Sequence, residues 1–349
     1  MNRSRLTLLF LLLSLSILFA GCSSQPAANS GPPVAKKIRI GFAMDALKQE
    51  RWQKDRDLFL AKAAELGAEV LLQTADGSDD AQMKQVESLL TQGIDVLVIV
   101  PHNAEVAGAM VEMAKKQGVP VISYDRLVRN SSPDLYISFD NERVGELQAK
   151  YLFEKMPTGN YALIGGAPTD NNATLLRKGQ MNILQAAIDR GDIKVVADQW
   201  AKEWLVEEAL KHAENALTQN SNKIDAFVVS NDGTAGGVVE ALTKQGLAGK
   251  VLVSGQDAEL AALQRVVKGT QTMTVYKPIS KLAPAAVEAA VALAKKEKLP
   301  TTRTVNNGRI DVPSILIEPI QVDKNNIEET VVKDGFQTRD KIFKDAPGN

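Results

Sequence analysis

Polar and aromatic side chains follow the apolar runs of this sequence at several separate places. The charged members of this set are Arg51, Asp125, Arg126, Asp170, Asp257 and Lys277. The neutral members are two amides and two of the three tryptophans: Asn172, Asn231, Trp52 and Trp204. Carboxylates accept hydrogen bonds from hydroxyl groups, Arg and Asn donate in planar geometry, and aromatic rings cover weakly apolar C–H faces. Together these groups fit the edge and the faces of a sugar ring.

The elements that must position these residues alternate between strands and helices. The first series predicts strands at 38–42, 70–72, 96–100 and 119–122 and helices at 55–66, 80–90 and 104–117. The second series predicts strands at 160–164, 195–196, 226–229, 251–253 and 273–276 and helices at 173–189, 204–217, 233–244 and 260–267. Run 96–100 is continuously apolar, as expected of a strand buried on both faces. The pattern predicts an α/β fold with two doubly wound parallel-sheet lobes.

The candidate residues lie after the predicted strands. The segment 50–54 is expected as a loop after the first strand, and the segments 123–126, 165–172, 230–232 and 254–257 follow later strands. In open parallel sheets, ligands bind beyond the carboxyl ends of the strands. Two facing lobes would therefore place all of these side chains in one shared cleft.

The N-terminus has the features of an export signal. Two arginines precede an apolar run over residues 6–20, and small residues stand directly before Cys22, the single cysteine of the chain. This order is typical of a signal peptide, and a cysteine at that position resembles the bacterial lipobox, in which the thiol is acylated. We expect a lipoprotein signal peptide at 1–21, a lipidated Cys22 and a flexible linker over 22–36. The body would then lie on the periplasmic or cell-surface side of a bacterial membrane.

Charge and histidine content exclude several classes of function. The chain carries 41 Lys and Arg against 42 Asp and Glu, so no basic excess favours nucleic acid. The two histidines, His102 and His212, are far from the cysteine and show no metal-ligand spacing. We expect neither a metal nor a cofactor.

Several longer segments resemble those of the bacterial D-xylose-binding proteins, which belong to the periplasmic sugar-binding proteins of ABC importers. The resemblance runs collinearly from about residue 37 to residue 336. The segments that carry it are Glu-Arg-Trp-Gln-Lys-Asp-Arg-Asp (50–57), Tyr-Asp-Arg (124–126), Tyr-Ile-Ser-Phe-Asp-Asn-Glu (136–142), Asp-Asn-Asn (170–172), Ser-Asn-Asp (230–232), Ser-Gly-Gln-Asp (254–257) and Gly-Thr-Gln-Thr-Met-Thr-Val-Tyr-Lys-Pro (269–278).

The resemblance implies a two-lobed receptor of the type I fold that closes on a monosaccharide. Trp52 and Trp204 would pack on the faces of the sugar. Its hydroxyls and ring oxygen would be hydrogen-bonded by Arg51, Asp125, Arg126, Asp170, Asn172, Asn231, Asp257 and Lys277. The lobes would comprise 37–143 plus 278–313 and 144–277 plus 314–345, with crossings near 143, 277 and 313. The implied partners are D-xylose and the permease and ATPase subunits of an importer, for a monomeric receptor.

Other interpretations of the same residues stay open. Asp170, Asn171, Asn172 and Asp232 also suit helix capping. Asp125 and Arg126 could form a surface ion pair, Trp204 could be core packing, and Lys277 could mark only a hinge. The receptor could serve a sensor instead of an importer. Carboxylates such as Asp125, Asp170 and Asp257 could also act as a glycosidase pair, although the sequence lacks a nucleophile motif or a phosphate loop.

Overall fold

The computed structural model describes residues 36–301 and 303–344. The predicted signal peptide, Cys22 and the linker up to residue 35 lie outside these residues. Within the described ranges, no helix combines the length and the apolarity that a membrane span requires. Residues from Lys37 onward form one unit by their contacts. This unit contains a seven-stranded and a four-stranded sheet, and each is the centre of one lobe.

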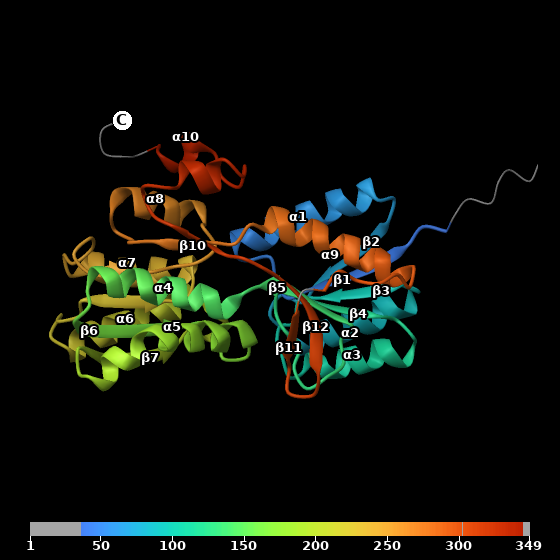
Figure 1. The fold of residues 1–349 in the computed structure, drawn as a ribbon, viewed down its shortest axis with the longest axis horizontal. Helices are drawn as coiled ribbons and strands as arrows, with labels where there is room; N and C mark the ends of the chain where they lie inside the picture. The colour runs from blue at the N-terminus through green and yellow to red at the C-terminus, as the bar shows by residue number, and fades with distance from the viewer. Residues whose placement is uncertain (1–35, 302, 345–349) are drawn as a thin grey trace, which may run out of the picture. The chain divides into compact units, whose positions relative to one another are not determined.

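The first lobe is built on a seven-stranded sheet with the order β11-β12-β5-β4-β3-β1-β2 (Figure 1). Its strands are β1 (Arg39–Met44), β2 (Glu69–Thr74), β3 (Val96–Ile99), β4 (Val121–Tyr124), β5 (Leu135–Phe139), β11 (Arg303–Asn306) and β12 (Asp311–Ile317). Its helices are α1 (Glu50–Glu65), α2 (Asp79–Thr91), α3 (Ala107–Lys116) and α9 (Ile279–Ala294). All neighbouring strands pair in parallel except β11 and β12, which are antiparallel.

Strand β3 shows how the sequence produces this layering. Val96 and Val98 pack into the core that α1 and α9 cover, whereas Leu97 and Ile99 pack into the core under α2 and α3. Successive side chains of a strand point to opposite faces, so an apolar run with no polar member is buried on both.

The second lobe is built on a parallel four-stranded sheet with the order β7-β6-β8-β9. These strands are β6 (Gly159–Gly165), β7 (Ile193–Trp200), β8 (Ala226–Val229) and β9 (Leu252–Val253). The helices of this lobe are α4 (Asn141–Lys155), α5 (Asn171–Asp189), α6 (Val206–Gln219), α7 (Asp232–Lys244) and α8 (Leu260–Lys268). Helices α4 and α5 cover one face of the sheet, and α6 and α7 cover the other. The predicted pair of doubly wound sheets is therefore confirmed.

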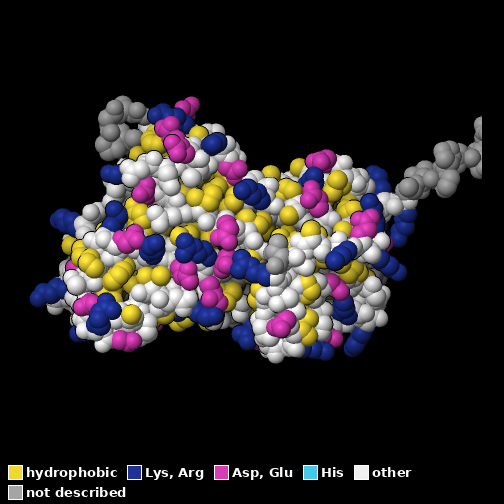
Figure 2. Space-filling view, in the orientation of Figure 1, with side chains coloured by type: hydrophobic (Ala, Val, Ile, Leu, Met, Phe, Trp, Pro, Cys, Tyr) yellow, Lys and Arg dark blue, Asp and Glu magenta, His cyan; other side chains and the backbone are white. Residues whose placement is uncertain are grey.

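Short elements complete the second lobe. Strands β10 (Thr274–Tyr276) and β13 (Ile320–Val322) form an antiparallel ribbon. The remaining elements are η1 (Lys202–Trp204), η2 (Glu328–Val332) and α10 (Arg339–Ile342). On the face shown in Figure 2, basic and acidic side chains are interspersed, and neither sign forms a continuous patch.

Three connections join the lobes, between β5 and α4, between β10 and α9, and between β12 and β13. The expected boundary at residue 313 falls inside β12, because this strand continues to Ile317 and pairs with β5. Pro313 precedes the part of β12 that pairs with β5, so its missing N–H removes no bond of that ladder. The third connection is therefore residues 318–319, between the end of β12 and the start of β13.

The expected loop at 50–54 is wrong, because these residues form the first turns of α1. Gln49 has extended backbone angles and precedes the helix, and Glu50 supplies the acidic side chain that favours the start of a helix. Arg51 and Trp52 are therefore held on a rigid helix.

Candidate functional site

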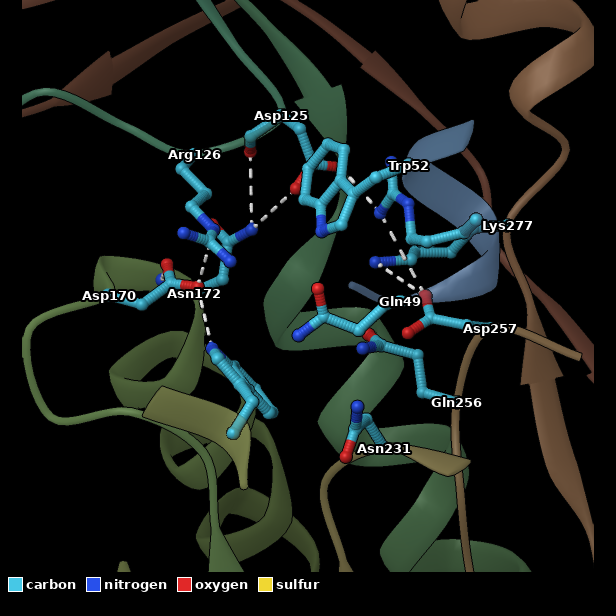
Figure 3. Close-up of a pocket in the computed structure, with 12 residues that line it drawn as sticks. Gln49, Trp52, Asp125, Arg126, Asp170, Asn172, Asn231, Gln256, Asp257 and Lys277 are labelled. Atoms are coloured by element: carbon cyan, nitrogen blue, oxygen red, sulfur yellow. Dashed lines mark hydrogen bonds and ion pairs between the residues drawn. The ribbon is translucent and has the colours of Figure 1, made fainter. Parts of the chain in front are cut away.

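One pocket collects residues from both lobes at the carboxyl ends of their strands (Figure 3). About 350 Å³ of empty space lies among its lining atoms, a figure that includes space open to solvent. All ten predicted ligand-binding residues line it, together with two residues that the sequence analysis missed: Gln49, Arg51, Trp52, Asp125, Arg126, Asp170, Asn172, Trp204, Asn231, Gln256, Asp257 and Lys277.

Arg51 is held rigidly at the first-lobe side of the pocket. It is 3% exposed, and Nε and Nη2 donate to Asp55 Oδ2 at 3.0 and 2.7 Å. Nη1 donates to Asp125 Oδ2 at 2.9 Å. Behind it, the Tyr124 hydroxyl donates to the fully buried Asp55. Two carboxylates and a tyrosine therefore fix the guanidinium before any ligand arrives.

Arg126 joins the two lobes across the pocket. Its Nη1 donates to Asp45 Oδ2 at 2.7 Å and to the carbonyl oxygen of Pro101 at 3.2 Å, both in the first lobe. Its Nε lies 2.8 Å from Asp170 Oδ2 in the second lobe. Arg126 and Asp125 are 5% and 2% exposed. The interpretation of this pair as a surface ion pair is therefore wrong.

Asp170 has two roles at once. Oδ1 caps α5 by accepting from the backbone N–H of Asn172 at 2.9 Å. Oδ2 accepts from Trp204 Nε1 at 3.1 Å and pairs with Arg126. Both oxygens therefore already accept bonds, and capping and pocket lining coexist in one residue.

Asp257 and Lys277 form an ion pair at the other end of the pocket. Lys277 Nζ lies 3.0 Å from Asp257 Oδ1, and Arg51 Nη1 lies 3.8 Å from the same oxygen. The two side chains are 6% and 4% exposed. The pair thus continues a row of alternating charges that runs from Lys277 through Asp257 and Arg51 to Asp125.

Four amides contribute the neutral side of the pocket: Gln49, Asn172, Asn231 and Gln256. Asn231 uses Oδ1 to cap α7 through the N–H of Thr234 at 3.0 Å, and its Nδ2 points toward the pocket (Figure 3). Asn172 Nδ2 crosses to the first lobe and donates to Asp125 Oδ1 at 3.1 Å. Asn172 Oδ1 and Gln256 Oε1 are buried and have no hydrogen-bond partner among the described residues. These two oxygens are available to hydroxyl donors.

Two adjacent glycines seat the tryptophans of the second lobe. A Cβ on Gly165 would lie 2.7 Å from Trp200, and one on Gly166 would lie 2.0 Å from Cη2 of Trp204. Only a residue without a side chain allows both rings to lie on this turn. The Trp204 ring is thereby held against the backbone at the pocket wall, where it is part of the lining.

Backbone strain marks several of the lining residues. Asp125, Trp204 and Asp257 all have positive φ, at 59°, 59° and 97°. Residues other than glycine rarely adopt this conformation, and such strain is concentrated at ligand clamps and active sites.

The charges of the pocket set its protonation states. Burial alone would raise the pKa of Asp125, but Arg51, Lys277 and Arg126 outweigh it and hold that pKa below its usual value. Burial raises the pKa of Asp170 despite the opposing charge of Arg126. The surrounding cations therefore favour the ionised form of Asp125, whereas burial disfavours the ionised form of Asp170.

The arrangement offers hydrogen bonding and stacking rather than metal binding. In residues 36–301 and 303–344, no group of three or more His, Cys, Asp or Glu side chains is placed to hold a metal ion. His102 instead contacts Asp45, with Nδ1 2.9 Å from Oδ1, and His212 lies by the carbonyl of Trp200. The pocket is suited to a small, uncharged, hydroxyl-rich ring.

The two missed residues carried a signal in the sequence. Gln256 stands directly before Asp257 in a strand-end segment, and Gln49 directly precedes the start of α1. Neighbours of a pocket residue in the same loop are natural candidates. Only the chain path beyond the strand decides which of them face inward.

Comparisons with known proteins agree with this geometry. A family model for a periplasmic binding protein domain matches residues 40–298. The chain is 56% identical over 309 residues to a D-xylose-binding periplasmic protein of Haemophilus influenzae, which covers 88% of this chain and 93% of the relative. It is 54% identical over 327 residues to a D-xylose-binding periplasmic protein of Escherichia coli, with 94% and 99% covered.

A solved structure extends the likeness to the fold. An ABC transporter solute-binding protein from Clostridium phytofermentans with bound β-D-glucose matches with a TM-score of 0.81 at 31% identity. The match covers 87% of this chain and 99% of that one. From its sequence and its fold, the chain belongs to the periplasmic binding protein family.

Proposed function

We propose that this protein captures D-xylose between its two lobes and delivers it to an ABC importer. The observation that carries the proposal is the pocket itself, which is lined by charged and amide groups from both lobes. The choice of D-xylose as the ligand is supported by the two D-xylose-binding relatives, each more than half identical to this chain.

The mechanism is hinged closure on the ligand. Arg126, Asp170 and Asn172 already link the lobes by direct contacts in this conformation. A sugar bound between the lobes bonds to groups on both, so it stabilises the closed state over the open one. The permease and the ATPase subunits of the importer then receive the sugar from a closed, monomeric receptor, without a cofactor.

Eleven of the twelve lining residues have a proposed role, and Gln49 has none. Trp52 and Trp204 pack on the C–H faces of the sugar. The groups that bond its hydroxyls and ring oxygen are Arg51, Asp125, Arg126, Asp170, Asn172, Asn231, Asp257 and Lys277, with Gln256 as an addition from the structure. Buried hydroxyls need partners, so this set favours a ligand with a hydroxyl at nearly every ring position.

Binding without catalysis fits the pocket better than hydrolysis does. A glycosidase needs one carboxylic acid that can hold a proton toward the scissile bond. Asp170, the lining carboxyl whose pKa burial raises, accepts N–H bonds on both oxygens. Asp125 and Asp257 pair with cations instead. No lining carboxyl is therefore set up as a general acid.

Calorimetric titration tests the function. The protein is the mature chain without residues 1–21, with Cys22→Ser to prevent acylation, and the sugars are D-xylose, D-ribose, L-arabinose, D-glucose and D-galactose. We expect D-xylose to bind most tightly and to change tryptophan fluorescence, since Trp52 and Trp204 line the pocket. Tighter binding of D-glucose would instead identify the ligand as the sugar that is bound in the solved structure described above. No binding of any of these sugars would overturn the proposal.

We further propose that the protein is exported and tethered by lipid on Cys22. The support is the basic and apolar start of the sequence and the placement of the lone cysteine after Ala20-Gly21. Cells fed labelled palmitate should incorporate the label into the native protein but not into Cys22→Ser. Equal labelling of the two proteins would show that Cys22 is not the site of lipidation and would overturn this proposal.

A further inference from the structure

Asp232 is a fully buried carboxylate that does not line the pocket. It is the first residue of α7, but Asn231 caps that helix. The carboxylate accepts from Gln271 Nε2 at 2.8 Å on Oδ1, and from Thr274 Oγ1 at 2.9 Å and the backbone N–H of Glu259 at 3.0 Å on Oδ2. Helix capping therefore does not explain this residue.

The bonds of Asp232 enclose the loop that carries two pocket residues. Its backbone N–H donates to the carbonyl of Gln256 at 2.9 Å, and its side chain holds the N–H of Glu259. Between these two points lie Asp257 and Ala258, with φ of 97° and 51°. Two consecutive residues other than glycine in this conformation persist only where surrounding contacts hold them.

Two neighbours of Asp232 add contacts to the same loop. We call the hydrogen bonds of Asp232 and Thr274 to residues 256–259 the clamp. Thr274 Oγ1, which donates to Asp232, also accepts from the N–H of Ala258 at 3.3 Å. Gly255 passes so close that a Cβ there would lie 2.0 Å from Asp232 Oδ1. Asp232 thus holds the loop before the strained residues through its backbone N–H, after them through its carboxylate, and at Ala258 through the Thr274 hydroxyl.

We propose that Asp232 is a positioning residue for sugar binding, which fixes the strained 255–259 loop so that Gln256 and Asp257 face the ligand. This inference rests on the proposed function, and it assigns a role to a residue that touches no ligand. Without the clamp, the loop relaxes toward ordinary backbone angles and Asp257 leaves its place beside Lys277 and Arg51.

The test compares two carboxylates at opposite ends of β8. Asp232 follows the strand, whereas Asp225 precedes it and accepts from the N–H of Asn160 at 2.7 Å, away from the pocket. Titrations of the mature chain with D-xylose are run at pH 8.5, because burial raises the pKa of Asp232 to about 7. We expect Asp232→Asn to raise the Kd about tenfold or more, and Asp225→Asn to leave it within about twofold.

A double-mutant cycle separates positioning from general destabilisation. If Asp232 acts through Asp257, adding Asp232→Asn to Asp257→Asn causes little further loss, with xylose raised to millimolar concentrations to measure the weak binding. An independent tenfold loss in that background would overturn the route through Asp257. If the wild type binds D-xylose and Asp232→Asn binds it with the same affinity, the inference is overturned. If the wild type binds no sugar, the proposed function is overturned instead.

A milder variant covers the case in which Asp232→Asn does not fold. Thr274→Val is nearly isosteric and removes only the hydroxyl that joins Asp232 to Ala258. We expect its Kd to rise in the same direction by about threefold or more, and to rise far less in the Asp257→Asn background. A Kd equal to that of the wild type would contradict the clamp.

Discussion

Replacing Asp257 by alanine is expected to weaken D-xylose binding about a hundredfold or more. Its Oδ1 lies 3.0 Å from Lys277 Nζ and 3.8 Å from Arg51 Nη1, and the residue is 6% exposed. Truncating one partner of a buried charge pair costs about 2–5 kcal/mol at an interface, and each 1.4 kcal/mol is about a factor of ten. The variant loses a hydroxyl acceptor and leaves two cations without their shared carboxylate.

The measurement is calorimetric titration of Asp257→Ala beside a control in the same lobe. Asp192 forms an exposed pair with Arg190 at 2.8 Å, and its side chain is 40% exposed. Because exposed pairs contribute little, Asp192→Ala should bind D-xylose with an affinity within about twofold of the wild type. Affinity of Asp257→Ala within about threefold of the wild type would remove this residue from the site.

Replacing Arg126 by methionine is expected to lower the free energy of unfolding by about 3 kcal/mol and to abolish tight binding of the sugar. The guanidinium lies 2.7 Å from Asp45 Oδ2 and 2.8 Å from Asp170 Oδ2. Methionine fills similar space, but it leaves both buried carboxylates without this cation. Removing one partner of a buried ion pair is strongly destabilising, by about 3–5 kcal/mol, because an uncompensated charge remains.

Arg129 provides the matched control for Arg126. It lies three residues further along the chain and pairs with Glu105 at 3.3 Å, with 39% of its side chain exposed. Arg129→Met should therefore change the free energy of unfolding by about 0–1 kcal/mol. Urea unfolding of both variants and the wild type at pH 7 measures the difference in the free energy of unfolding. Equal stability of the two variants would contradict a structural role for the Arg126 pairs.

The sequence predicted the fold and the lining because both follow from short-range patterns. A run such as 96–100 identifies a strand buried on both faces, and the residues after such strands must gather at one edge. The start of α1 was missed, because Arg51 and Trp52 precede the regular helical spacing that begins at Asp55. Where a strand-end segment becomes helix depends on packing that the local pattern does not contain.

The partners behind the pocket could not be predicted at all. Asp45 holds Arg126 in place, and Asp55 holds Arg51 in place. Residues 45 and 126 are far apart in the sequence, and only the fold brings them together. Asp55 belonged to a predicted helix, with nothing to distinguish it from a solvent-exposed acid. Asp55 contacts the Tyr124 hydroxyl, which only the tertiary fold brings near it. Its contact with Arg51 is between residues one helical turn apart, and it was missed because the helix was not predicted to begin at Glu50.

Contacts between the lobes also occur outside the pocket. The N–H of Ala104 donates to the carbonyl of Thr169 at 3.0 Å, and Glu50 Oε2 accepts from the N–H of Leu260 at 3.0 Å. These bonds join protein to protein, so in the proposed mechanism they contribute the same free energy to closure whichever sugar is bound. Strengthening or weakening them multiplies every apparent Kd by a common factor. The overall affinity of the receptor and its preference among sugars are thus determined by different residues. Substitutions at the inter-lobe contacts outside the pocket can change the sugar concentration that the receptor detects without changing which sugar it prefers.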